Sequence, residues 1–231
     1  MCAGSEPRTG SPALIPSTAE KSLRDWLIEP AQSDPEYALG LEDETRWSQI
    51  SVPVMHAWTG AGRPLHLVEQ SVAKNDADPK TLAWYWMLVR WTGPDGARCE
   101  QPLLRFVEGR PISGVTTNFL EWSCAKLEAL GKEALLLVWD NAPWHVSKEV
   151  RAWIGDHNRR VKLDGQGVRT ASCCLPIKSP WLNPVEPRWI HGKRKVAEAG
   201  RLLNAQELRE RVCAHFGCEY EEHLPIPKNV A

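Results

Sequence analysis

The apolar run from Ala134 to Trp139, which ends at Asp140, constrains the fold of this chain more than any other sequence feature. Such an uninterrupted run indicates a strand buried on both faces, as in a sheet that is covered by helices on each side. The next segment favours a helix that Ser147 caps, and residues 168–175 favour another strand. A strand, a helix and a second strand in this order predict an α/β fold.

The amino-terminal half favours strands over helices. The expected strands are residues 37–41, a hairpin formed by 52–58 and 65–72, residues 81–91 and residues 103–107. The expected helices are residues 21–32, 115–130 and 205–216, with a basic helix that starts near Asn183 and ends near Gly200. Because strands come first and helices then alternate with strands, we expect a mixed sheet with helices packed on it.

The composition excludes several classes of protein. A hydrophobic fraction of 42% and a charged fraction of 25% exclude disorder throughout. No apolar run approaches the ~20 residues that cross a bilayer, and the amino terminus has no apolar segment typical of a secretory signal. Seven cysteines without a C-x-x-C pair favour a reducing cytoplasm. The twelve tryptophans favour a packed core over a surface that stacks on bases.

The charge is distributed unevenly, although the net charge is only −1. Residues 141–200 hold 11 Lys and Arg against 5 Asp and Glu, whereas the other residues hold 17 against 24. A basic segment within an acidic chain suits either a surface that binds phosphate groups or an ordinary solvated face.

Two aspartates lie where apolar strands are expected to end, Asp43 after residues 37–41 and Asp140 after Trp139. Carboxylates at such positions face the crevice beyond the sheet, and two on adjacent strands can share a divalent cation such as Mg²⁺. Glu44 is an alternative to Asp43 as the first ligand, because neighbouring residues of a strand point to opposite faces and only one can reach the ion.

Glu186 has two interpretations. Asn183-Pro-Val-Glu186 has the pattern of a helix capping box, with proline at the first helical position and glutamate at the third. Asn204-Ala-Gln-Glu207 repeats this pattern, and there we expect capping alone. Local sequence thus favours a structural role for Glu186.

Longer motifs point to a metal-binding role. Trp139-Asp-Asn-Ala-Pro-Trp-His145 and Ser179-Pro-Trp-Leu-Asn-Pro-Val-Glu-Pro187 precede a basic helix. Together they resemble the carboxyl half of DDE transposases of the insertion-sequence and mariner superfamily. The segment of residues 39–47 is similar to the family's first-aspartate segment. The likeness extends over roughly residues 37–218.

The resemblance implies a ribonuclease H-like mixed sheet with flanking helices and a cofactor of two Mg²⁺ or Mn²⁺ ions. Asp43, Asp140 and Glu186 match the three metal-binding carboxylates. His145 is expected to line the site and orient water or phosphate, with Asn141 and Asn183 in supporting positions. The residues expected to contact DNA are Lys178, Arg188, Lys193, Arg194 and Lys195.

We therefore expect a tail and linker helix over residues 1–36, a catalytic domain over 37–200, and a helix and tail over 201–231. The expected partner is DNA, bound by a homodimer, with a cytoplasmic location at the nucleoid and no membrane association. The superfamily's helix-turn-helix region does not precede Asp43, so a separately encoded part is expected to supply it. The expected function is a metal-dependent transposase that hydrolyses phosphodiesters and transfers strands; the alternative is a truncated, catalytically idle remnant or regulator that associates with DNA.

Overall fold

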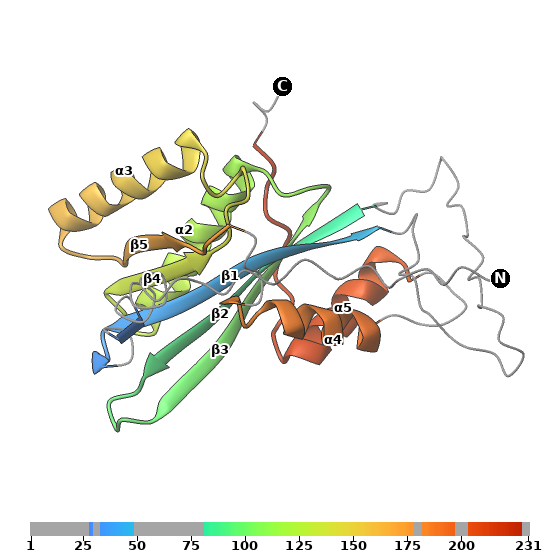
Figure 1. Ribbon diagram of the computed structural model, residues 1–231, viewed down its shortest axis with the longest axis horizontal. Helices are drawn as coiled ribbons and strands as arrows, with labels where there is room; N and C mark the ends of the chain where they lie inside the picture. The colour runs from blue at the N-terminus through green and yellow to red at the C-terminus, as the bar shows by residue number, and fades with distance from the viewer. Residues whose placement is uncertain (1–27, 30–32, 49–80, 178–181, 197–202, 228–231) are drawn as a thin grey trace, which may run out of the picture.

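The structure is a computed structural model that describes residues 28–29, 33–48, 81–177, 182–196 and 203–227. Five strands form one sheet in the order β3-β2-β1-β4-β5 (Figure 1). Strand β1 pairs antiparallel with β2 and parallel with β4, so the sheet is mixed. The strands are β1 (Tyr37–Ser48), β2 (Thr81–Thr92), β3 (Arg98–Glu108), β4 (Ala134–Trp139) and β5 (Arg169–Cys174).

Helices cover both faces of this sheet (Figure 1). One apolar core joins the sheet to α4 (Glu186–Val196) and α5 (Ala205–Phe216). A second core lies on the opposite face, against α2 (Ser113–Ala129) and α3 (Lys148–Asp164). The expected mixed sheet with flanking helices is confirmed.

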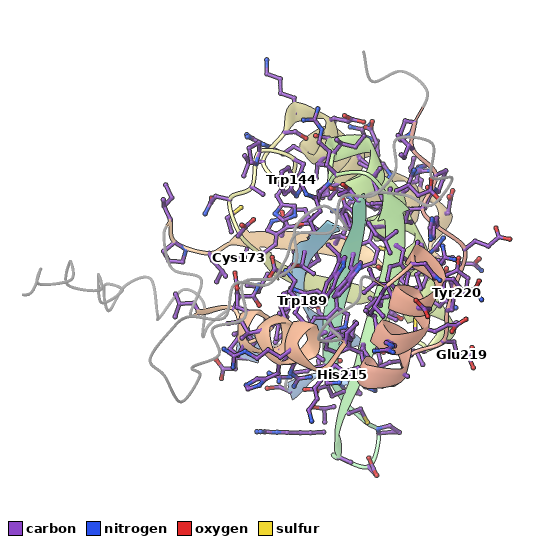
Figure 2. The ribbon with its side chains drawn as sticks, turned by 90° about the vertical axis from the view of Figure 1, so that its right-hand side faces the viewer. Trp144, Cys173, Trp189, His215, Glu219 and Tyr220 are labelled. Atoms are coloured by element: carbon purple, nitrogen blue, oxygen red, sulfur yellow. The ribbon has the colours of Figure 1, made fainter. Side chains whose placement is uncertain are left out.

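Tryptophan packing attaches α4 to the sheet. Trp189 of α4 contacts Trp84 and Trp86 of β2, with ring centroids 5.4 and 4.8 Å apart. Figure 2 shows Trp189 where α4 meets the strands. These three indoles are buried, so the core interpretation of the tryptophans holds for them. The contacts set the distance between the start of α4 and the strands.

The expected and observed elements differ most at β1. We expected a strand of residues 37–41 that ends before the acidic residues, but β1 continues to Ser48. It continues because β2 pairs with it as far as Ser48 opposite Thr81, a long-range partner that local sequence does not reveal. The expected hairpin of residues 52–58 and 65–72 lies outside the described residues, as does nearly all of the expected helix of 21–32.

The segment after α5 covers the edge of the sheet. The backbone amide of Leu224 donates to the carbonyl of Phe106 in β3 at 2.8 Å, and the Arg105 guanidinium donates to the carbonyl of Glu222 at 2.8 Å. A covered edge strand cannot pair with a strand of another chain at these positions. Within the described residues, no helix is long and apolar enough to cross a membrane.

The packing of α4 predicts the effect of one substitution. Trp189→Ala should lower the free energy of unfolding by about 3–5 kcal/mol, as expected for truncating a buried aromatic side chain. Chemical denaturation followed by circular dichroism measures this loss. The matched control is Ile190→Ala on the same helix, which should change stability little because Ile190 is 51% exposed. Similar losses in both variants would contradict the described packing of α4.

Candidate functional site

Strand β1 carries three consecutive acidic residues through the middle of the sheet. Its parallel register with β4 ends at Leu41 opposite Val138, so Asp43 lies two residues farther along, toward Asp140. Asp43 shares a strand face with Leu39 and Leu41, which belong to the core beneath α4 and α5. Glu42 and Glu44 point to the opposite face, which α2 and α3 cover. Asp43 therefore lies within β1 rather than at its end, and its side chain is on the α4 side.

Burial and neighbouring negative charges disfavour the ionised form of the Asp43 carboxyl group. Burial is the largest of the causes that together raise its pKa to about 8; the negative charges of Glu42 and Glu186 come next, with smaller contributions from Glu44 and Asp140. Asp43 is thus within electrostatic range of both Asp140 and Glu186. A site with several acidic groups and one high carboxyl pKa favours the arrival of a cation.

Asn183 connects the start of α4 to β1. Its side-chain amide donates to the Glu42 carbonyl at 3.0 Å, and its side-chain oxygen accepts from the Val185 amide at 3.1 Å. The carboxamide is buried. It therefore holds Glu186, three residues farther on, next to the segment that carries Asp43.

The capping box expected at Asn183–Glu186 is not formed. The Asn183 side chain accepts from Val185, one residue too early, and among the described contacts the Glu186 carboxylate makes no return bond to Asn183. Pro184 lies in a turn, and α4 begins at Glu186. The box expected at Asn204–Glu207 is present with both bonds. The difference leaves the Glu186 carboxylate available for another role.

His145 is the centre of a second group of contacts, on the other face of β1. Its Nδ1 lies 2.8 Å from Asp140 Oδ1, and its Nε2 lies 2.9 Å from Glu44 Oε1 and 3.2 Å from Glu42 Oε2. Carboxylate oxygens accept hydrogen bonds, so both ring nitrogens donate and the imidazole is positively charged. Burial alone would lower the pKa of His145, but the charges of Glu42 and Glu44 and the bond to Asp140 raise it well above its ordinary value.

Two indoles fix the position of this imidazole. The Trp139 ring stacks on it with centroids 4.5 Å apart, and Trp144 meets it edge-on. The Trp144 indole nitrogen also donates to Glu44 Oε1 at 2.9 Å. Figure 2 shows Trp144 well apart from Trp189, which lies beside α4. The expected site residue His145 is therefore a buried link between the end of β4 and the acidic residues of β1.

Glu42 is the functional candidate that the sequence analysis missed. Its side chain is fully buried, and burial together with the charge of Glu44 raises its pKa to about 8. The ligand atoms of Glu42, Glu44 and His145 lie within 4.8 Å of one another. Strand alternation within Glu42-Asp43-Glu44 was the available signal, because it sends the two glutamates to one face together.

Asp140 has a different environment from the other acidic residues. Its side chain is 57% exposed, and its Oδ1 accepts bonds from His145 and from the Ala142 amide, at 2.8 Å each. The hydrogen bond with His145 is the largest influence that holds the pKa of Asp140 below its usual value. The Asn141 side chain donates to the Leu175 carbonyl and so joins the ends of β4 and β5. Asp140 is therefore ionised, oriented and open to solvent.

The five basic residues expected to contact DNA have different environments. Lys193 is partly buried, which lowers its pKa, while the nearby charges of Asp43 and Glu186 act in the opposite direction. Arg188 forms an ion pair with Glu100 of β3 at 2.8 Å. Arg194 and Lys195 are exposed on the last turn of α4. Lys178 lies outside the described residues.

Comparisons with known proteins agree with this architecture. Residues 99–209 match the sequence model of a family described as DDE superfamily endonuclease. None of the curated proteins compared with the chain matches it.

Several solved structures are similar to the described fold. The Mos1 mariner paired end complex with Mn matches with a TM-score of 0.50 and 12% identity, over 93% of this chain and 60% of that chain. The Mos1 strand transfer complex matches with a TM-score of 0.49 and 11% identity, over 94% and 59%. The chain thus spans about 60% of the length of these Mos1 chains. LC9-RNase H1, described as a type 1 RNase H, matches with a TM-score of 0.38 and 10% identity, over 80% and 87%. The expected ribonuclease H-like fold is confirmed.

The raised pKa of Asp43 predicts how stability depends on pH. In the unfolded chain this carboxyl ionises near its ordinary pKa of 3.8, whereas in the folded chain it ionises near 8. The folded state therefore holds an extra proton between these values, and wild-type stability falls as the pH rises through this window. Asp43→Asn removes the ionisation, so without divalent ions it should be more stable than the wild type by about 1–3 kcal/mol at pH 8. The two proteins should converge near pH 4. Thermal unfolding at several pH values measures the difference, and a constant offset across this range would contradict the described burial of Asp43.

Proposed function

We propose, from the match of residues 99–209 to the DDE superfamily endonuclease family, that this chain is the catalytic domain of a metal-dependent DNA transposase. The observation that supports the proposal is the electrostatic interaction among three acidic residues from separate elements. The negative charges of Glu186, at the start of α4, and of Asp140, just after β4, both raise the pKa of Asp43 in β1. The family match supports the broader assignment to transposase-type nucleases.

The acidic residues suit a divalent ion. Asp43, Asp140 and Glu186 offer only carboxylate oxygens, the ligands that Mg²⁺ and Mn²⁺ accept, and Asp140 is open to solvent. The high pKa of Asp43 is what an acidic site without a compensating cation produces. When bound, two such ions would activate a water molecule and stabilise the leaving oxygen of a phosphodiester.

The residues of the chain position and hold these carboxylates. His145 keeps Asp140 ionised and oriented through a hydrogen bond of 2.8 Å. Asn183 holds the start of α4 against the Glu42 carbonyl. Trp189 anchors the same helix in the core. The proposed chemistry is hydrolysis at the ends of the mobile element, followed by attack of the freed 3′-hydroxyl on target DNA without a covalent enzyme intermediate.

The end of α4 is the proposed DNA-binding surface. Lys193, Arg194 and Lys195 follow Glu186 by seven to nine residues, which is about 10–14 Å along a helix. DNA whose phosphates bind at this end of α4 would extend along the helix to the acidic site at its start. Five other basic residues of the 141–200 segment lie on α3, on the opposite face of the sheet from α4: Lys148, Arg151, Arg159, Arg160 and Lys162. Arg188, paired with Glu100, is the weakest of the proposed DNA contacts.

The proposed partners are target DNA and a second copy of the chain bound to DNA. The Mos1 structures are described as a paired end complex and a strand transfer complex, which is compatible with such an assembly. We also propose that a separately encoded helix-turn-helix part reads the element ends, and that the chain acts in the cytoplasm at the nucleoid. The alternative function, an idle DNA-associating remnant, has the same basic surface but no catalytic use of the carboxylates.

One substitution separates metal binding from helix capping. Glu186→Gln should reduce Mg²⁺- or Mn²⁺-dependent DNA cleavage by at least about 100-fold, because losing a metal ligand removes several kcal/mol of transition-state stabilisation. Its stability should change little, since the Glu186 carboxylate does not complete a capping box. Cleavage of labelled DNA, with unfolding measured in parallel, provides both values.

Glu207→Gln is the matched control for this experiment. It carries the same change at the third position of the α5 capping box, where glutamine can still complete the box. It should cleave DNA like the wild type. Equal cleavage by Glu186→Gln and Glu207→Gln would contradict the role of Glu186. Inactivity of the wild type itself would favour the idle remnant.

The DNA-binding surface predicts a salt dependence. The wild type should bind DNA without sequence preference, and its affinity should fall steeply as salt rises, since each phosphate contact releases counterions. Changing Arg194 and Lys195 together to Gln should lower the slope of log affinity against log salt by about 1–2. The matched control changes Arg160 and Lys162 of α3, which are also exposed, to Gln. A slope lowered equally by both pairs would argue against α4 as the surface.

A further inference from the structure

We propose that Glu42, Glu44 and His145 form a second cation site, buried on the face of β1 opposite Asp43, for a transition-metal ion such as Zn²⁺. Their ligand atoms, two carboxylate oxygens and one imidazole nitrogen, all lie within 4.8 Å of one another. The site shares no ligand with the proposed catalytic site, although His145 also bonds to Asp140, and it does not rest on the proposed function.

The distances in this cluster are close to those of a metal centre. Zinc bonds of about 2.0–2.2 Å to oxygen and nitrogen place tetrahedral ligand atoms about 3.4 Å apart. His145 Nε2 already lies 3.2 Å from Glu42 Oε2 and 2.9 Å from Glu44 Oε1. Displacements of a few tenths of an ångström would therefore admit an ion between them.

Glu42 provides the second, independent observation that points to a ligand. Its side chain is fully buried; among the described residues Oε1 has no hydrogen-bond partner, and Oε2 has only the 3.2 Å contact with His145 Nε2. A buried carboxylate without such partners is costly, and its nearest cationic atom, His145 Nε2, is shared with Glu44. A divalent ion would balance the charge of both carboxylates when the imidazole is neutral.

The surroundings of His145 are those of a metal-ligating histidine. Such a histidine usually donates its second ring N–H to a carboxylate, which fixes the ring and raises the basicity of the ligating nitrogen. Here Nδ1 donates to Asp140 at 2.8 Å, and Nε2 faces the two glutamates. The Trp144 indole likewise donates to Glu44, so both ligands are oriented from outside. Binding of the ion would displace the Nε2 proton, which is released to solvent while the Nδ1 proton remains.

The site is closed, so the ion is structural. The side chains of Glu42 and His145 are 0% exposed and that of Glu44 is 3% exposed, which leaves no open position for a substrate. An ion there would join β1 to the segment after β4. A mixture of imidazole nitrogen and carboxylate oxygen favours zinc or a related transition metal over Mg²⁺, which prefers oxygen ligands alone.

The test measures metal retention. The full chain is refolded with one equivalent of Zn²⁺, treated with a chelator and desalted, and the bound metal is measured by mass spectrometry. The wild type should retain about one ion per chain, because the closed site releases metal slowly. Glu44→Gln and His145→Gln should retain less than a tenth of that amount. The proposal is overturned if the wild type retains no more zinc than these two variants. In that case the cluster binds a proton and no metal ion.

Two further measurements cover other outcomes. Asp43→Asn and Glu186→Gln remove ligands of the proposed catalytic site and should retain zinc like the wild type. If these two variants lose zinc while His145→Gln retains it, the proposal is also overturned. If His145→Gln does not fold, Co²⁺ in the refolded wild type is used instead. An intense visible absorption band is expected for cobalt held by these three residues, which has fewer than six ligands, whereas only the weak spectrum of hydrated cobalt would contradict the site.

Discussion

The burial of three consecutive acidic residues in the central strand β1 is the constraint on which the rest of the structure depends. Strand alternation places Glu42 and Glu44 on one face of the sheet and Asp43 on the other. The negative charge on each face must therefore be balanced by groups on that same face. On one face the His145 imidazolium lies against Glu42 and Glu44. On the other, burial and the charges of Glu42 and Glu186 raise the pKa of Asp43 to about 8, and the partly buried Lys193 lies within electrostatic range. The face that carries Asp43 is where we propose that divalent ions act on DNA.

Two polar contacts connect these faces to the elements that flank β1. His145 joins Glu44 to Asp140, residues that lie 101 and 5 positions away from it along the chain. Asn183 joins the Glu42 carbonyl to the start of α4. The apolar cores anchor β4 and α4. Each of the two contacts therefore limits the movement of a carboxylate. These packing contacts and hydrogen bonds restrict the positions of Asp140 and of the start of α4.

The sequence predicted the features that local patterns determine. The apolar run of β4, the Ser147 cap of α3 and the capping box of α5 are all present. It did not predict that β1 continues past Asp43, since that extension depends on pairing with β2. It also did not reveal that Asn183 bonds to Glu42, because a residue 141 positions away replaces the expected local partner. The assignment of Asp43, Asp140 and Glu186 came from motif resemblance and remains a proposal, which the electrostatics of Asp43 support.

The measurement that tests the central claim most directly is anomalous X-ray scattering from crystals of the protein grown with Mn²⁺. We expect an anomalous peak in direct contact with the carboxylates of Asp43 and Asp140, with Glu186 beside it, and the peak should disappear in crystals of Asp43→Asn. Crystals that bind manganese elsewhere, with no peak at these carboxylates and with Glu186 turned toward the backbone of its own helix, would contradict the claim.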